Sequence, residues 1–110
     1  MQDLYLELQA KTAQLDQCIK TLRKNGTAKA QTERDYKVLL REESIKLRDE
    51  GMAIGMIDKV VYGIPSVANA RFQRDLCDTV YQANLEAINS IKLQLRLIDA
   101  QIEREWGQSG

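Results

Sequence analysis

The sequence predicts an all-α protein, built as a long antiparallel helical hairpin that resembles a coiled coil and carries a short helical tip. The strongest evidence is one apolar row in the C-terminal half of the chain: Cys77, Tyr81, Asn84, Ile88, Ile91, Leu95, Ile98 and Ile102. Its members alternate in steps of four and three, which keeps one side of a helix turned towards a partner helix. The chain contains one proline in 110 residues and few aromatic side chains, a composition that suits long helices better than a sheet.

The first arm of the hairpin is predicted from a similar row: Met1, Tyr5, Leu8, Thr12, Leu15, Ile19 and Leu22. The pair Asn25-Gly26 that follows would normally end a helix. Counting on in sevens from the last member nevertheless reaches Tyr36, and the same phase takes in Leu40 and Leu47. This continuity favours one helix over about residues 3–50 that is kinked near Asn25-Gly26. A full turn there, followed by a separate helix, is the alternative.

A short helical tip over residues 51–65 is predicted between the two arms. Gly51 ends the first arm, and the apolar run after it has the spacing of two or three helical turns before Gly63 closes it. Pro65 then opens the last helix at its first position, where the missing N–H group costs nothing. The tip therefore reverses the chain direction and begins the second arm.

The second arm is expected to end near Trp106, so that residues 1–106 form one helical-hairpin domain and residues 107–110 a flexible tail. With a tip centred between the arms, Cys18 is expected to lie opposite the region of Leu97. The two cysteines of the chain are then too far apart for an intramolecular disulfide.

The last helix carries a second apolar row beside the first: Leu76, Val80, Ala83, Ala87 and Leu97. Two adjacent rows make an apolar face too wide for one partner helix. We therefore predict a homo-oligomeric helical bundle, a dimer or a higher even number. Its seam is expected to consist of Tyr81, Asn84, Ile88, Ile91, Leu95, Ile98 and Ile102. Asn84 either fixes the register and helix number of this seam, as a buried Asn commonly does, or marks a partly wet position.

The composition argues against catalysis and against metal or cofactor chemistry. The chain has no histidine, which removes the usual general base and the commonest metal ligand. Only two cysteines offer soft ligands, and paired carboxylates have basic neighbours at helical spacing. We expect a protein that is not an enzyme and binds no cofactor or metal.

Charge and hydropathy bound the location and the partners. Lys plus Arg equals Asp plus Glu at 16 each, so no global field attracts nucleic acid or an anionic membrane. Met1 is followed by a charged amphipathic run instead of a signal peptide. No apolar stretch approaches the roughly 20 residues that a membrane span needs. A cytoplasmic protein with reduced thiols is expected.

The tip and the start of the last helix hold the densest functional chemistry. A predicted site for a nucleotide-like anion consists of Lys59, Tyr62, Ser66, Arg71 and Arg74. Free N–H groups at a helix N-terminus and two guanidinium groups suit a phosphate, and the tyrosine ring suits a base. Alternatively, the two arginines form an ion-pair clasp across the neck. Its acidic partners would be Asp49, Glu50 and Asp75. The basic cluster Lys20, Arg23, Lys24 and Lys29 is a further anion or partner surface, or a solvated helix face.

The same region can also be interpreted as a helix-turn-helix. Leu47–Met52, Ile57 and Gly63–Val67 have the order of a first helix, a tight turn and a recognition helix. The spacing is one residue too long, and Asp58 occupies a position that is usually small and apolar. The chain also lacks a strong basic stripe, so binding of nucleic acid is the weaker interpretation.

Four stretches together resemble small helical proteins of phages and prophages of Gram-positive bacteria: Asp3–Leu8, Leu47–Gly51, Val61–Asp75 and Glu86–Trp106. The resemblance implies a protein of the host bacterial cytosol that works by binding. The expected function is to antagonise host defence, either by sequestering a small anionic, nucleotide-like signal or by blocking a defence protein. The alternative is an accessory or regulatory protein that associates with nucleic acid through the helix-turn-helix-like tip.

Overall fold

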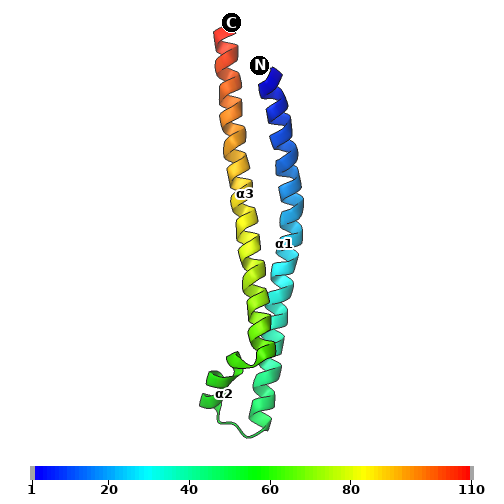
Figure 1. Cartoon of the computed structure of the whole chain (residues 1–110), viewed down its shortest axis with the longest axis vertical. Coiled ribbons are helices and arrows are strands. Elements are labelled where there is room, and N and C mark those ends of the chain that lie inside the picture. The colour runs from blue at the N-terminus through cyan, green and yellow to red at the C-terminus, as the bar shows by residue number, and fades with distance from the viewer. Residues whose placement is uncertain (1, 110) are drawn as a thin grey trace. The chain divides into compact units, whose positions relative to one another are not determined.

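The computed structural model describes residues 2–109, and the regular secondary structure of that range is entirely helical. Figure 1 shows α1 (Gln2–Asp49), α2 (Ile54–Val60) and α3 (Pro65–Ser109), and the 3-10 helix η1 (Val61–Gly63) links the last two. Two long helical arms joined by a short helical tip confirm the predicted all-α fold. Contacts divide the chain into two compact units, Met1–Lys24 with Gln82–Gly110 and Asn25–Tyr81. The single domain expected over residues 1–106 stays a prediction.

Helix α1 continues through Asn25 and Gly26 without a break, so the alternative of a full turn at this pair is wrong. Gly26 lies close to the ring of Tyr81, and a Cβ built on it would stand 3.5 Å from that ring. An ordinary van der Waals distance remains even with a side chain in place. The glycine therefore lowers helix propensity here without being required by a turn.

The C-terminus of α1 has the hydrogen bonds of a Schellman motif. Gly51 adopts φ +92°, which L side chains rarely adopt. Its N–H group donates to the carbonyl of Arg48 at 3.0 Å, and the N–H group of Met52 donates to that of Leu47 at 3.1 Å. Leu47 and Met52 both pack against the core of this unit, as usual for this motif. The predicted helix stop at Gly51 is confirmed.

The core of the unit Asn25–Tyr81 is a cluster that the tip closes. Its buried members come from every element of the unit: Tyr36, Ile57, Val61 and Val67. Val61 and Val67 flank the Ile64-Pro65 junction, where the N–H group of Ala68 donates to the carbonyl of Ile64 at 2.9 Å. Pro65 is the first residue of α3, as predicted. Burial of apolar side chains from α2 and η1 thus holds the tip against the arms.

In the other unit, the predicted apolar row of α3 faces inward, because Ile88, Ile91, Ile98 and Ile102 are buried. The row predicted for α1 is half right. Leu8, Leu15 and Leu22 are partly buried, but the alternate places belong to Leu4, Lys11 and Cys18. Tyr5, Thr12 and Ile19 are exposed instead, and Met1 lies outside the described residues. The predicted row and the observed row lie one position apart, as with Tyr5 beside Leu4 and Ile19 beside Cys18, and both contain apolar side chains. Periodicity alone could therefore not decide which row faces inward.

The register of the first unit also differs from the expectation. The side-chain N–H group of Asn84 donates to the carbonyl of Cys18 at 3.1 Å, so Cys18 lies opposite Asn84 and not opposite Leu97. Within the second unit, α2 folds beside the last turns of α1 (Figure 1) and does not simply cap both arms. A tip assumed to be symmetric therefore gave the wrong register. Both cysteines are free.

Helix α3 extends three residues beyond its expected end and covers 107–109, while Gly110 lies outside the described residues. The indole N–H group of Trp106 donates to the hydroxyl of Tyr5 at 3.1 Å. This contact joins the last turns of α3 to the first turns of α1, and thereby favours helix at a position where the sequence predicts a flexible tail.

Candidate functional site

Arg74 forms a clasp on the side of the second unit. Its guanidinium donates to Asp75 Oδ1 from Nε at 3.0 Å and from Nη2 at 2.8 Å. Nε lies 3.8 Å from Glu33 Oε2, and the guanidinium carbon lies 4.5 Å from the centre of the Tyr36 ring. Hydrogen bonding to Asp75 raises the pKa of Arg74 above its ordinary value. These contacts support the clasp interpretation for Arg74. Asp75 is the predicted partner, and Glu33 takes the place of Asp49 and Glu50.

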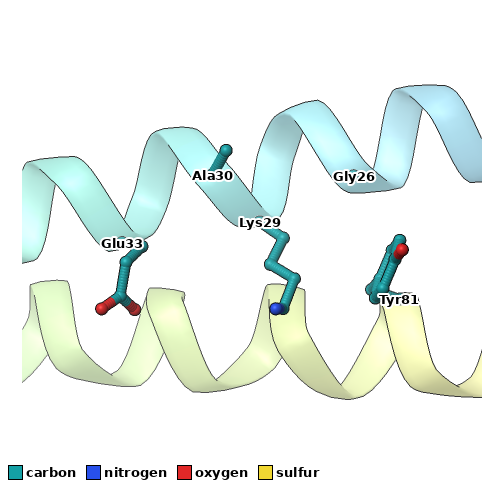
Figure 2. A pocket seen from close by; sticks show the side chains of 5 residues that line it. All are labelled: Gly26, Lys29, Ala30, Glu33 and Tyr81. Carbon is teal, nitrogen blue, oxygen red and sulfur yellow. The ribbon is translucent and has the colours of Figure 1, made fainter.

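A second polar cluster lies farther along the same unit, around an open pocket of about 290 Å³ (Figure 2). Lys29 and Glu33 extend from α1 towards α3, and the Tyr81 ring lies below Gly26. Lys29 Nζ is 3.5 Å from Asp78 Oδ1 and 5.4 Å from the centre of the Tyr81 ring. Because Lys29 is already paired with Asp78, and Glu33 with Lys37 and Arg74, the pocket offers a ligand no unpaired charge.

The residues of the predicted anion site are only partly brought together. The guanidinium carbon of Arg71 lies 5.7 Å from the centre of the Tyr62 ring, and both side chains are exposed. Lys59 and Ser66 are exposed too. Arg74, one turn farther along α3, is held by its own partners. The structure thus brings Tyr62 and Arg71 together and leaves Arg74 in the clasp.

The predicted oligomer seam is largely covered within a single chain. Of its members, Ile88, Ile91, Ile98 and Ile102 are buried, and the others, Tyr81, Asn84 and Leu95, are partly buried. An interface between chains therefore has to use another face. The second apolar row is available: Leu76 and Val80 are 46% and 45% exposed in one unit, and Ala83, Ala87 and Leu97 are exposed in the other.

A third surface escaped the sequence prediction, on the outer face of α1. Three arginines repeat at intervals of seven residues, Arg34, Arg41 and Arg48, and each is followed at once by an acid. Exposed Val38 and Ile45 lie between them. The heptad spacing of these arginines is visible in the sequence. Apolar periodicity does not reveal it, because most residues of the row are charged.

Neither a metal site nor a membrane span supplies a further clue to function. Over residues 2–109, no three Cys, Asp or Glu side chains come together as metal ligands. Within the same residues, no helix combines the length and the apolar character needed to cross a bilayer. Comparisons with protein-family models, with curated proteins and with solved structures gave no match.

Proposed function

We propose that the protein acts by binding, without catalysis, and associates with itself through the second apolar row of α3. The observation that carries the proposal is the exposure of Leu76 and Val80, at 46% and 45%, beside Cys77 and Tyr81, which are partly buried. Apolar side chains that repeat along a helix and face water are typical of an interaction surface. Burying each of these two side chains on association contributes on the order of 1 kcal/mol to the free energy of association.

The partner in the cell is proposed to be a host defence protein or a small anionic signal, as the resemblance to phage proteins favours. In this proposal the assembled helices hold several copies of the tip in a fixed arrangement. Several weak contacts made at once then bind more tightly than one alone. The exposed side chains of the tip, Ile54, Met56, Val60 and Tyr62, make it the favoured contact surface.

Self-association is tested by the concentration dependence of thermal unfolding in wild type and in the double variant Leu76→Ser, Val80→Ser. Association that accompanies folding makes the melting temperature rise with protein concentration. We expect that rise in wild type and a much smaller one in the variant. Thr79→Ser, an exposed position on the same helix, is the matched control and should behave as wild type. A melting temperature of wild type that does not depend on concentration would count against the proposal.

A second candidate function rests on the 5.7 Å approach of Arg71 to the Tyr62 ring. A guanidinium beside an exposed aromatic ring offers a charge for a phosphate and a stacking surface for a base. A panel of nucleotides in a thermal-shift assay tests this site. Stabilisation that is lost in Arg71→Ala but kept in Lys92→Ala supports it, and no stabilisation of wild type by any nucleotide removes it. A salt-dependent gel shift would indicate nucleic acid instead.

A further inference from the structure

The outer face of α1 carries one short apolar line, made of Val38 and Ile45. The two side chains are seven residues apart and therefore lie on the same face of the helix. Val38 is 48% exposed and Ile45 45% exposed. Ile45 also lines an open groove of about 310 Å³ with Ile54 of α2, which is 73% exposed. Apolar surface thus extends from α1 onto the tip, within the unit Asn25–Tyr81.

Opposite charges flank this line on its two sides. Residues three and four apart are neighbours on a helix surface, so Ile45 touches the positions of Arg41 and Arg48 on one side and of Glu42 and Asp49 on the other. Val38 likewise has Arg34 and Arg41 on one side and Asp35 and Glu42 on the other. The arginine row is Arg34, Arg41 and Arg48, and the acidic row is Asp35, Glu42 and Asp49. We call these six charges and the two apolar residues the α1 stripe.

Over residues 2–109, most charges of the α1 stripe have no partner. Asp35 accepts a hydrogen bond from Gln31 at 2.9 Å, but none of the other five forms an ion pair or a side-chain hydrogen bond over the described residues. Other charges on the same helix are paired, as Lys37 is with Glu33 and Lys46 with Glu43. Asp58 of α2 also borders the groove.

We propose that the α1 stripe is an interface for a second copy of this chain, with the two α1 helices parallel and in register. Charge complementarity between the two copies supports this arrangement. When two copies are related by a two-fold axis along the helices, the arginine row of one copy faces the acidic row of the other. In an antiparallel pair, rows of like charge face each other, which costs several kcal/mol at an interface. The stripe therefore complements itself in one orientation only, as flanking charges do in a parallel coiled coil.

This interface is separate from the proposed association through α3. A protein with two different self-complementary faces forms assemblies larger than a dimer, either closed or extended. The α1 stripe sets the relative direction of two copies, because charged rows determine orientation and partner choice more than affinity. Two tips would then point in the same direction.

A charge-swap experiment on the whole chain tests the α1 stripe. One variant is Arg41→Glu, Arg48→Glu, and the other is Glu42→Arg, Asp49→Arg. On its own, each variant places like charges opposite each other across the interface between the two α1 helices. We therefore expect the dissociation constant for association through the α1 stripe to rise at least about tenfold. Mixed in equal amounts, the two variants should recover the wild-type mass in sedimentation velocity. Circular dichroism establishes that each variant remains helical.

The control is Lys92→Glu, Arg96→Glu, which changes the net charge as the first variant does but at exposed positions of the other unit. It should keep the wild-type mass alone, and its mixture with Glu42→Arg, Asp49→Arg should not recover that mass fully. The proposal is overturned if each swapped variant alone has the wild-type mass. It is also overturned if the equimolar mixture keeps the lower mass of the separate variants. Such a result leaves association through α3 intact, because that association responds to Leu76→Ser, Val80→Ser.

Discussion

Three cations of the second unit lie over aromatic rings: Lys29 over Tyr81, Arg71 over Tyr62 and Arg74 over Tyr36. Of these rings only Tyr36 is buried. A guanidinium over a buried ring covers the edge of the core with its apolar plane while its N–H groups reach carboxylates. At the scale of single residues, Arg74 is therefore structural, and Arg71 stays accessible to a ligand.

Replacing the two arginines by alanine should separate these roles. Arg74→Ala is expected to destabilise the fold by about 1 kcal/mol, because it removes the contact with Tyr36 and partly exposed ion pairs with Glu33 and Asp75. Arg71→Ala should change stability by less than about half of that. Urea unfolding followed by circular dichroism measures both. A larger loss for Arg71→Ala would reverse the two assignments.

Gly26 offers a substitution that should stabilise the protein. It lies inside α1, where glycine costs roughly 1 kcal/mol relative to alanine. A Cβ at this position would stand 3.5 Å from the Tyr81 ring, an ordinary contact distance. We therefore expect Gly26→Ala to raise the free energy of unfolding by about 0.5–1 kcal/mol. Gly51→Ala is the contrast, since φ +92° at Gly51 strains any L side chain and should lower stability.

At the scale of the helices, α3 shows which patterns a sequence can reveal. Its inward row was predictable because steps of four and three continue without interruption and nearly all members are apolar. The rows of α1 were harder, since Tyr5 and Ile19 compete with Leu4 and Cys18 for the inward position. Between residues 25 and 36 the inward positions include polar Asn25 and Lys29, which hydrophobic periodicity cannot assign.

The candidate sites also differ in how far they could be predicted from the sequence. Tyr62 and Arg71 are close in sequence, so their contact was within reach of local reasoning. The partner of Arg74 across the helices, Glu33, is far away in sequence, and its identity depends on the register set by the asymmetric tip. The heptad spacing of the α1 stripe is visible in the sequence. Its interpretation as an interface required the structure, which shows which of its side chains are exposed and unpaired.

The two apolar rows of α3 should respond differently to truncation. Ile91 is 4% exposed, whereas Leu97 is 61% exposed. Ile91→Ala is therefore expected to cost about 2–4 kcal/mol, through lost burial and the cavity that remains. Leu97→Ala should cost less than about 1 kcal/mol in a dilute sample. Urea unfolding of both variants at the same low concentration makes the comparison, and equal losses would contradict the assignment of inner and outer rows.

At the scale of the whole molecule, one unit buries the apolar row of α3, the other buries the cluster around the tip, and both leave apolar surface exposed. The second row of α3 and the α1 stripe are regular and lie on different helices. Regular exposed rows of this kind favour association with other helices. We therefore propose that this protein acts through assembly and binding, with the tip as the surface that contacts a partner.

Sedimentation equilibrium of the wild-type protein at micromolar concentration tests that central claim most directly. It reports the mass of the particle without a label and without assuming a partner. At this concentration we expect an assembly of an even number of copies, whose mass falls in the double variant Leu76→Ser, Val80→Ser while the helical content is retained. A well-folded monomer of 12.6 kDa throughout the micromolar range would contradict it.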